Sequence, residues 1–438
     1  MEPLTIGVLS IVGIIALILI GFHVATALAL VGFGAIYAIT GRFGVASSLL
    51  YNTAHAGVAD YVYAVIPLFV VMGLFATQSG AIRDLFVAAA VLTGKLRGGL
   101  GVATVGANAV FAAVTGVSVA SAAVFSKIAI PEMARAGYDR RFALGIVGSS
   151  ALLGMLIPPS ILMIVYGVLS EQSIGRLFAA GIVPGLLVAL TLAVTIVVRA
   201  YRTPALVGSE GDASTRPIES RRVALVRVWP LLALVGLVLG GIYAGWFTPT
   251  EAGAVGAAGA LVLALAKRRL GGNAMRAILL DTGRTTAAIF LLLVAAQIYS
   301  RALTLSGLPA AVSAWVLSLG VEPIFVVLAF VAVIILLGCF IDSVSILLLT
   351  MPIMVPVVGA LGYDLIWFGM VAIVAVELGL LTPPFGMVVF AMKASLSGDV
   401  RVEEIFAGVT PFLIALCAAL ALLIALPGLT TFLPDLLF

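Results

Sequence analysis

The sequence predicts an all-α protein that crosses a membrane many times and contains an inverted repeat. Of its 438 residues 63% are hydrophobic and only 10% are charged, and the mean hydropathy is +1.29. A soluble protein carries about a quarter charged residues. Apolar stretches long enough to span a bilayer as helices recur along the chain. In addition, one long sequence motif occurs twice. Together these observations predict a polytopic membrane protein built from two related halves.

The apolar stretches predict about ten membrane-spanning helices and two hairpins. The N-terminus lacks the basic region of a cleavable signal, so we expect the first stretch to be a retained span. Two apolar stretches, 100–130 and 322–357, are predicted to be re-entrant hairpins that enter and leave on one side. The spans are predicted at 4–21, 24–40, 61–79, 142–169, 175–198, 230–247, 251–266, 285–304, 365–392 and 405–430.

The basic residues favour hairpins over spans at these two stretches. All but three of the 23 Lys and Arg residues fall into five clusters. With two hairpins, all five clusters face one side, which the positive-inside rule makes cytoplasmic, and both termini lie on the other side. This topology explains the net charge of +4, so we expect no nucleic-acid partner. The clusters are Arg83, Lys95, Arg97; Lys127, Arg135, Arg140, Arg141; Arg199, Arg202, Arg216, Arg221, Arg222, Arg227; Lys267, Arg268, Arg269, Arg276, Arg284; and Lys393, Arg401.

The repeated motif reads GYDRRFALGIVGSSALLGMLIPP at 137–159 and GYDLIWFGMVAIVAVELGLLTPP at 362–384. Eight of the 23 positions are identical without a gap, and the same offset of 225 aligns Ser118 with Ser343. Five predicted crossings, an odd number, separate the two copies, so they face opposite sides of the membrane. Inverted repeats of this kind are typical of secondary transporters.

Each copy of the motif ends in two consecutive prolines near the middle of a predicted span. A proline has no amide hydrogen, so the carbonyl four residues earlier loses its helical partner. At this depth a neighbouring segment, a trapped water or a cation must satisfy it. A simple kink is the alternative, but two pairs at matching positions favour a binding site. The prolines are Pro158, Pro159, Pro383 and Pro384, and the carbonyls belong to Gly154, Met155, Gly379 and Leu380.

The two hairpins are predicted to form the opposite wall of this site. The first carries AAVTGVSVASAAV (112–124), whose small residues let backbones approach closely. The second carries Asp342, and Glu377 lies within the ninth span. A carboxylate at membrane depth is costly and is therefore a functional candidate. The alternatives are that Asp342 lies at a hairpin tip in an aqueous vestibule and that Glu377 pairs with a polar group between helices.

Several other function classes do not fit the sequence. His23 and His55 are the only histidines and form no His-Glu-x-x-His motif, which excludes a zinc protease of that type. No Gly-x-Ser-x-Gly motif and no phosphate-binding loop is apparent. We therefore expect neither enzyme activity nor an organic cofactor. A passive channel needs a continuous polar path, whereas the small-residue hairpins look more like gates.

Several sequence blocks resemble the large membrane subunit of TRAP (tripartite ATP-independent periplasmic) transporters. They include IPLFVVMG (66–73), PEMARAGYDRRFA (131–143), FTPTEAGAV (247–255) and GLLTPPFGM (379–387), and they cover nearly the whole chain in the expected order. The resemblance implies an elevator-type transporter of the ion-transporter superfamily, located in the bacterial inner membrane with both termini in the periplasm. It implies sodium-coupled import of a small organic anion, a carboxylate.

The resemblance also implies two protein partners. A soluble periplasmic binding protein would deliver the substrate. A small membrane subunit of four helices is expected as a separate chain, because this chain starts directly at the first span of the large subunit. A transporter of the same superfamily that needs no binding protein, or one coupled to protons through Asp342 or Glu377, is the alternative.

Two sodium sites and one substrate site are implied by the resemblance. Sodium is a hard cation that suits carbonyl and hydroxyl oxygens. The first sodium site would use Thr115, Ser118, Gly154, Ile157 and Pro159. The second would use Gly338, Asp342, Gly379, Thr382 and Phe385. Substrate would lie between the hairpin tips, near Ser118, Ser121, Ser160, Ser343 and Ser345.

The same resemblance divides the chain into scaffold and transport parts. Scaffold helices are expected at 1–80 and 229–305, and a cytoplasmic loop at 201–228. The first transport repeat (81–200) would hold an arm helix, the hairpin 100–130 and the helix broken at Pro158–Pro159. The second repeat (306–438) would hold the hairpin 322–357 and the helix broken at Pro383–Pro384.

Overall fold

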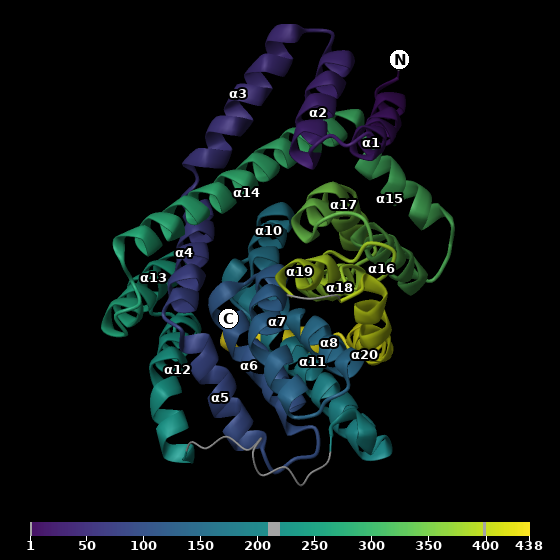
Figure 1. Ribbon diagram of the computed structural model, residues 1–438. Coiled ribbons are helices and arrows are strands. Elements are labelled where there is room, and N and C mark those ends of the chain that lie inside the picture. Colours follow the sequence, from purple (N-terminus) through teal and green to yellow (C-terminus); the bar gives the residue numbers. More distant parts are fainter. Residues whose placement is uncertain (1, 209–219, 397–399) are drawn as a thin grey trace.

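The computed structural model describes residues 2–208, 220–396 and 400–438, and the elements in these ranges are helices (Figure 1). This confirms the predicted all-α class. The N-terminal part and the middle part of the chain each form a group of helices, and α14 of the middle group is long and runs diagonally in this view. The first group is α1 (Pro3–Leu19), α2 (Val24–Thr40), α3 (Phe43–Ala59), the 3₁₀ helix η1 (Tyr61–Ala64), α4 (Val65–Gln78) and α5 (Ala81–Thr93). The middle group is α12 (Arg221–Tyr243), α13 (Pro249–Ala266) and α14 (Gly272–Ser306).

The two repeats supply the remaining helices, and α5 is also the first helix of the first repeat. The first repeat consists of α5 followed by α6 (Gly99–Thr115), α7 (Ser118–Arg135), α8 (Arg140–Ala151), α9 (Leu153–Leu156), α10 (Ile161–Ser170), α11 (Ile174–Arg202) and η2 (Pro204–Leu206). The second consists of α15 (Leu308–Ser318), α16 (Pro323–Gly338), α17 (Ser343–Ala360), α18 (Leu365–Gly379), α19 (Met387–Ser395), α20 (Val402–Ala425) and α21 (Gly428–Leu437). Each predicted hairpin is therefore a pair of helices, α6–α7 or α16–α17, joined by a short non-helical tip.

By length and composition, seven helices of the described ranges can cross a membrane, or eight if the bent pair around Pro158–Pro159 counts as one span. This number is smaller than the predicted ten because α1 and α2 are short, with 17 residues each, and because a break separates α18 from α19. One of the seven long apolar helices is α17, which is half of the second hairpin.

The Gly-Tyr-Asp motif forms the same turn in both copies. Gly137 and Gly362 adopt left-handed φ angles of 76° and 80°, which glycine tolerates because it has no Cβ. Two residues later, Asp139 and Asp364 cap helices α8 and α18: their carboxylates accept hydrogen bonds from backbone amides three residues on, at 2.9 Å and 2.8 Å. The repeated motif is therefore a conserved piece of architecture within this chain, a tight turn followed by a capped helix.

Both proline pairs interrupt their helices, as predicted. In the first repeat the chain leaves the helix after Leu156 and resumes at Ile161, and the two segments are bent by 42°. In the second repeat the interruption is longer and runs from 380 to 386. A cis peptide bond joins the two prolines in each pair.

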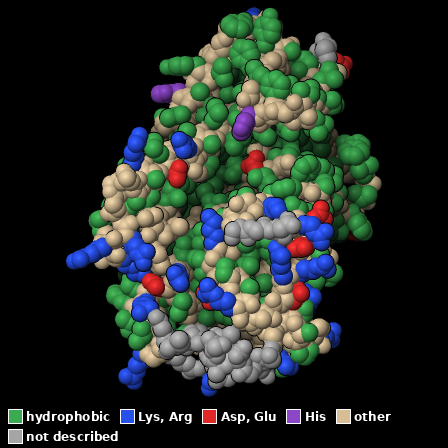
Figure 2. All heavy atoms as spheres, in the orientation of Figure 1, with side chains coloured by type: hydrophobic (Ala, Val, Ile, Leu, Met, Phe, Trp, Pro, Cys, Tyr) green, Lys and Arg blue, Asp and Glu red, His purple; other side chains and the backbone are tan. Residues whose placement is uncertain are grey.

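The surface is mostly hydrophobic around α1–α3, whereas Lys and Arg are spread over the lower half and left edge of the view (Figure 2). Leu9, Val12, Tyr51 and Val58 are among the exposed apolar side chains of these helices. An exposed apolar surface of this extent is expected of a protein that lipid surrounds.

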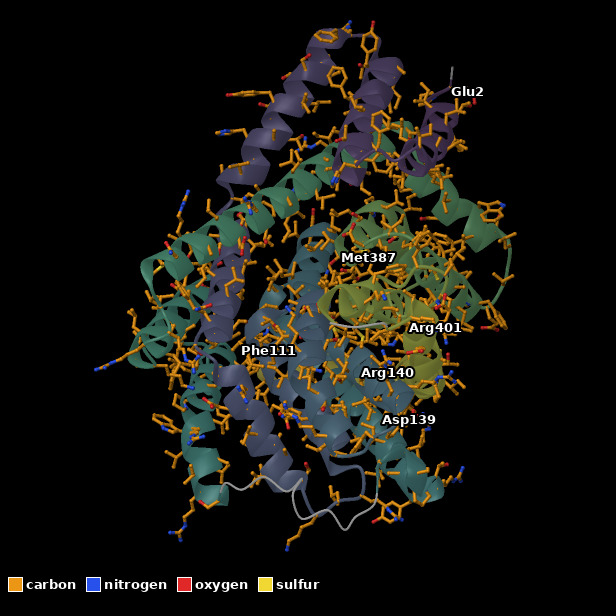
Figure 3. The ribbon with its side chains drawn as sticks, in the orientation of Figure 1. Glu2, Phe111, Asp139, Arg140, Met387 and Arg401 are labelled. Carbon is orange, nitrogen blue, oxygen red and sulfur yellow. The ribbon has the colours of Figure 1, made fainter. Side chains whose placement is uncertain are left out.

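Basic residues of both repeats meet at one acidic side chain. Arg140 begins α8 and Arg401 precedes α20, and the two lie close together (Figure 3). Both pair with Glu404, at 3.6 Å and 3.5 Å.

Of the predicted polar loop 201–228, residues 209–219, including Arg216, lie outside the described ranges. The described rest of this segment is partly helical, because it contains η2 and because α12 already begins at Arg221.

Helices α8 and α20 approach each other through two glycines. A Cβ added to Gly145 would lie 2.1 Å from the carbonyl oxygen of Gly408, and one added to Gly408 would lie 2.1 Å from the carbonyl oxygen of Arg141. Backbone atoms cannot move aside as a flexible side chain can. This contact, which joins the first repeat to the C-terminal part, therefore depends on glycine at both positions.

We expect Gly408→Ala to lower the stability of the protein, because the added methyl group forces α8 and α20 apart. The cost of such overpacking is about 1–3 kcal/mol. Thermal unfolding of the purified protein in detergent checks this, with Gly240→Ala as the matched control. Gly240 lies within α12 and has no atom within 4 Å of an added Cβ, so alanine there should leave the melting temperature unchanged or raise it slightly. Equal melting temperatures for the two variants would contradict the prediction.

Candidate cation and substrate site

The first helix break satisfies part of its backbone locally. The hydroxyl of Ser160, which is 1% exposed, donates a hydrogen bond to the carbonyl of Met155 at 2.5 Å. This carbonyl is one of those that the prolines free. The prediction that a neighbouring segment, a water or a cation must satisfy it is therefore wrong, because a side chain within the same break reaches back to it.

The tip of the first hairpin packs directly into this break. A Cβ added to Gly154 would lie 2.9 Å from the Cα of Ser118, and one added to Gly116 would lie 2.8 Å from the carbonyl oxygen of Pro159. Thr115 immediately precedes the tip and is buried. The structure thus brings together Thr115, Ser118, Gly154 and Pro159 of the first predicted sodium site. Ile157, the fifth residue, lies in the same break, and its side chain packs on Gly185 of α11.

The second break also closes on itself. The amide of Thr382 donates to the carbonyl of Gly379 at 3.0 Å, and the amide of Val388 donates to the carbonyl of Leu380 at 3.3 Å. The prediction that these two carbonyls need an outside partner is wrong. The reason is the length of the interruption, which lets the chain turn back and supply its own amides.

Residues of the second predicted sodium site gather at the tip of the second hairpin. A Cβ added to Gly338 would lie 2.6 Å from the Cα of Gly379, so hairpin and broken helix touch backbone to backbone. Asp342 caps α17 by accepting a hydrogen bond from the Ser345 amide at 3.1 Å. The Thr382 hydroxyl donates to the carbonyl of Leu378 at 2.8 Å.

Phe385, the remaining residue of this set, has a half-exposed side chain. Its ring lies against that of Phe340, with 5.8 Å between the ring centroids. Phe340 belongs to the tip of the second hairpin, between Gly338 and Asp342. Phe385 therefore lies beside the hairpin tip, where its main chain rather than its ring is suited to a cation.

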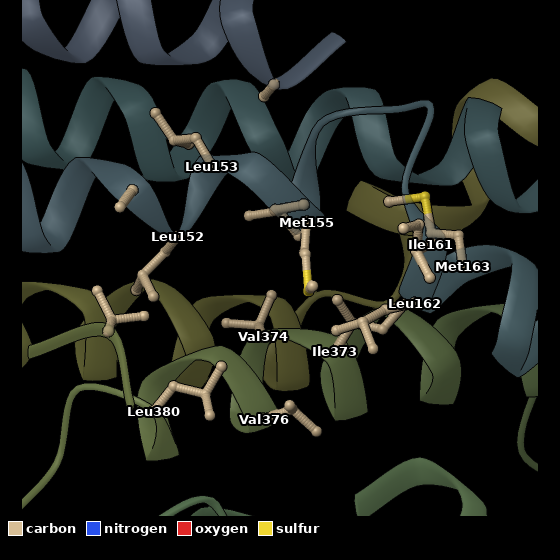
Figure 4. Close-up of a cluster of buried hydrophobic side chains, with 14 of the residues drawn as sticks. Leu152, Leu153, Met155, Ile161, Leu162, Met163, Ile373, Val374, Val376 and Leu380 are labelled. Atoms are coloured by element: carbon tan, nitrogen blue, oxygen red, sulfur yellow. The ribbon is translucent and has the colours of Figure 1, made fainter. Parts of the chain in front are cut away.

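The five predicted substrate serines are all buried, and two of them meet at one residue. Ser160 of the first repeat and Ser343 of the second both contact Met155, the latter with 3.5 Å between its hydroxyl and the sulfur. Met155 points from the first break toward Ile373 and Val374 of α18 (Figure 4). The hydroxyls of Ser121 and Ser345 have no hydrogen-bond partner within the described ranges.

A direct hydrogen bond joins the two repeats at Ser118. Its hydroxyl donates to the carboxyl oxygen Oε2 of Glu377 at 2.6 Å, across 259 residues of sequence. Glu377 is 2% exposed. Glu377 therefore pairs with a polar group of another helix, as one of the predicted alternatives had it.

Sequence reasoning missed the role of two side chains of this region, those of Asn108 and Met155. The Asn108 side chain of α6 donates to the hydroxyl of Ser150 at 2.7 Å, and both residues are fully buried. A lone amide inside an apolar helix is the signal that points to Asn108. Met155 carries no such signal, because methionine is an ordinary core residue.

The oxygen-rich composition of the site suits an alkali cation. Several oxygen-bearing groups meet near the first break: the hydroxyls of Ser118 and Ser121, the carboxyl group of Glu377 and the backbone at Gly154. Hard cations prefer such oxygen ligands. Within the described ranges, no three His, Cys, Asp or Glu side chains form a group that could hold a metal ion. The unpartnered hydroxyl of Ser121 and oxygen Oε1 of Glu377 leave acceptors for an ion.

Comparison with known proteins identifies the family. The model of the DctM component of tripartite ATP-independent periplasmic transporters matches residues 11–429. The C4-dicarboxylate TRAP transporter large permease protein DctM of Pseudomonas aeruginosa is 38% identical over 86% of both chains. The sialic acid TRAP transporter large permease protein SiaM of Vibrio cholerae is 33% identical over 87% of this chain and 88% of that one.

A solved structure shares the fold at low sequence identity. The structure of Neisseria gonorrhoeae MtrF covers 97% of this chain and 95% of its own with a TM-score of 0.62 and 12% identity. The helical pairs, the two interrupted helices and the sequence matches therefore lead to one assignment: this chain belongs to the large-permease (DctM) family of TRAP transporters, which are transporters and not enzymes.

Proposed function

We propose that this protein imports a small organic anion, a carboxylate, across the bacterial inner membrane by sodium-coupled secondary transport. The observation that carries the proposal is the meeting of hairpin tip and broken helix at Ser118 and Gly154. Among the described residues, two buried oxygen atoms without a hydrogen-bond partner support it: the Ser121 hydroxyl beside Gly154 and Oε1 of Glu377, whose Oε2 is bonded to Ser118. Sodium, when bound, would neutralise negative charge at these oxygens, and the residues present fit that demand.

Pairing of the two repeats supports a substrate site between the hairpin tips. Met155 contacts Ser160 and Ser343, so polar groups of both halves come together inside the protein. Small buried hydroxyls can donate hydrogen bonds to a carboxylate once water is excluded. The substrate is proposed to be a carboxylate because the two relatives are named for C4-dicarboxylates and sialic acid.

An elevator mechanism is part of the proposal, with 1–80 and 229–305 as the scaffold and 81–200 and 306–438 as the moving repeats. Helix α4 meets the first hairpin at a glycine: a Cβ added to Gly73 would lie 2.8 Å from the carbonyl oxygen of Val114. This glycine lets the backbone of α4 approach the tip closely without a side chain between them. A separate four-helix membrane subunit and a periplasmic binding protein complete the proposed system, with both termini of this chain in the periplasm.

Uptake by proteoliposomes tests the proposed function. The vesicles contain this chain with its small membrane subunit, and the binding protein is added outside with labelled C4-dicarboxylates or sialic acid. We expect uptake only with an inward sodium gradient and with the binding protein present. Replacement of sodium by choline should reduce uptake to background, because the cation sites remain unfilled.

The other outcomes separate the alternatives. Uptake that persists without sodium and follows a proton gradient would remove sodium coupling from the proposal. Uptake that needs sodium and no binding protein would identify a transporter of the same superfamily that takes its substrate directly.

We expect Gly154→Ala to abolish sodium-dependent uptake. The added Cβ would lie 2.9 Å from the Cα of Ser118 and 3.0 Å from the hydroxyl of Ser121, so the hairpin tip can no longer seat in the break. Gly106→Ala is the matched control, because Gly106 lies in α6 of the first hairpin, away from the break, and has no atom within 4 Å of an added Cβ. If both variants transport as well as the original protein, the contact at Gly154 does not form the site.

A further inference from the structure

Glu377 is a buried acidic side chain whose position needs a reason. Of the Asp, Glu, Lys, Arg and His residues whose side chains the structure describes, it alone is buried, at 2% exposure. One of its carboxyl oxygens, Oε2, accepts the hydrogen bond from Ser118. The other, Oε1, has no partner within those ranges. Burying a carboxyl group with a single partner is costly, so the fold alone would not favour it.

Ser118, the partner of this carboxyl group, belongs to a pair of buried serines in the first repeat. Ser118 begins α7, and Ser121 follows it by about one helical turn. The Ser121 hydroxyl is fully buried and has no partner in the described part of the chain. The two serines flank Gly154, since an added Cβ there would lie 3.0 Å from the Ser121 hydroxyl. Two hydroxyls and a carboxyl group thus converge on the first break.

The internal repeat shows that the architecture does not require an acid here. The offset of 225 pairs Glu377 with Leu152 and Ser118 with Ser343. Leu152 is buried at the junction of α8 and α9, so the same helical position accepts an apolar side chain in the other copy. Ser343 accordingly faces the sulfur of Met155 rather than a carboxyl group. The acid therefore serves something that distinguishes the first site from the second.

We propose that Glu377 is the anionic ligand of the first sodium site, supplied to the first repeat by the second. This inference rests on the proposed sodium coupling and adds a residue that the family resemblance does not place in either site. A carboxylate neutralises the charge of a bound cation where the dielectric constant is low, which neutral hydroxyls and carbonyls cannot do. With Glu377, Ser118 and Ser121 as ligands, the first site holds one negative charge for one positive ion, whereas the second relies on Asp342 or on neutral oxygens.

Sodium binding to purified protein tests this proposal without relying on transport. The melting temperature of the protein in detergent is measured as sodium chloride replaces choline chloride at constant ionic strength. We expect Glu377→Gln to raise the sodium concentration for half-maximal stabilisation at least tenfold, equivalent to about 1.4 kcal/mol. Glutamine keeps the size of the side chain and an oxygen that can accept the Ser118 hydrogen bond, so only the charge is lost.

Two further variants make the result decisive. Glu403→Gln removes the same charge from an exposed position of α20 and should keep the sodium dependence of the original protein. Glu377→Met is a second neutral replacement that avoids a buried polar group, in case the glutamine variant does not fold. If Glu377→Gln or Glu377→Met needs the same sodium concentration for half-maximal stabilisation as the original protein, Glu377 is not a sodium ligand, although sodium coupling would stand. A protein whose melting temperature never responds to sodium overturns the sodium-coupled function itself, and the role of Glu377 with it.

Discussion

The close approach of hairpin backbone to broken-helix backbone is the constraint on which the rest of this structure depends. Gly154 touches Ser118, and Gly338 touches Gly379, at distances that no Cβ would allow. Inside a bilayer an interrupted helix must find partners for its polar groups within the protein. The hairpin tip excludes lipid from the interruption, and the break then satisfies its own carbonyls, as Thr382 does for Gly379.

The two halves of the chain meet this constraint in different ways. The short first break has a serine hydroxyl that reaches back to Met155, whereas the long second break turns the backbone itself. The two copies of the repeat share the residues that form the turns, such as the glycine and aspartate of Gly-Tyr-Asp. They differ in residues at the candidate sites. Glu377 and Leu152 occupy equivalent positions, and only one of them carries charge. Pseudo-symmetry therefore fixes the architecture but not the chemistry of the two sites.

Local patterns in the sequence predicted the architecture well and the contacts poorly. Helix breaks follow from the missing amide of proline, and spans from apolar length, so both could be predicted. Helix α3 was missed because polar residues such as Asn52 interrupt its apolar run. The hydrogen bond between Ser118 and Glu377 crosses 259 residues, and no local pattern encodes such a pairing. Likewise, which group donates a hydrogen bond to a carbonyl freed by proline depends on how the chain turns beyond that proline.

The proposed site, shared between the repeats, would constrain how the protein can move. Suppose that the first hairpin and α18 both supply oxygens to one ion. Separating them would then remove both Ser118 and the ion from the Glu377 carboxyl group, which would stay buried in a medium of low dielectric constant at a high cost in free energy. Keeping them together avoids this cost, so the two repeats should travel as one body. Relative motion is then left to contacts that lack interlocking side chains, such as Gly73 of α4 against the hairpin tip. The buried acid between the repeats thus favours an elevator over a rocking of one repeat against the other.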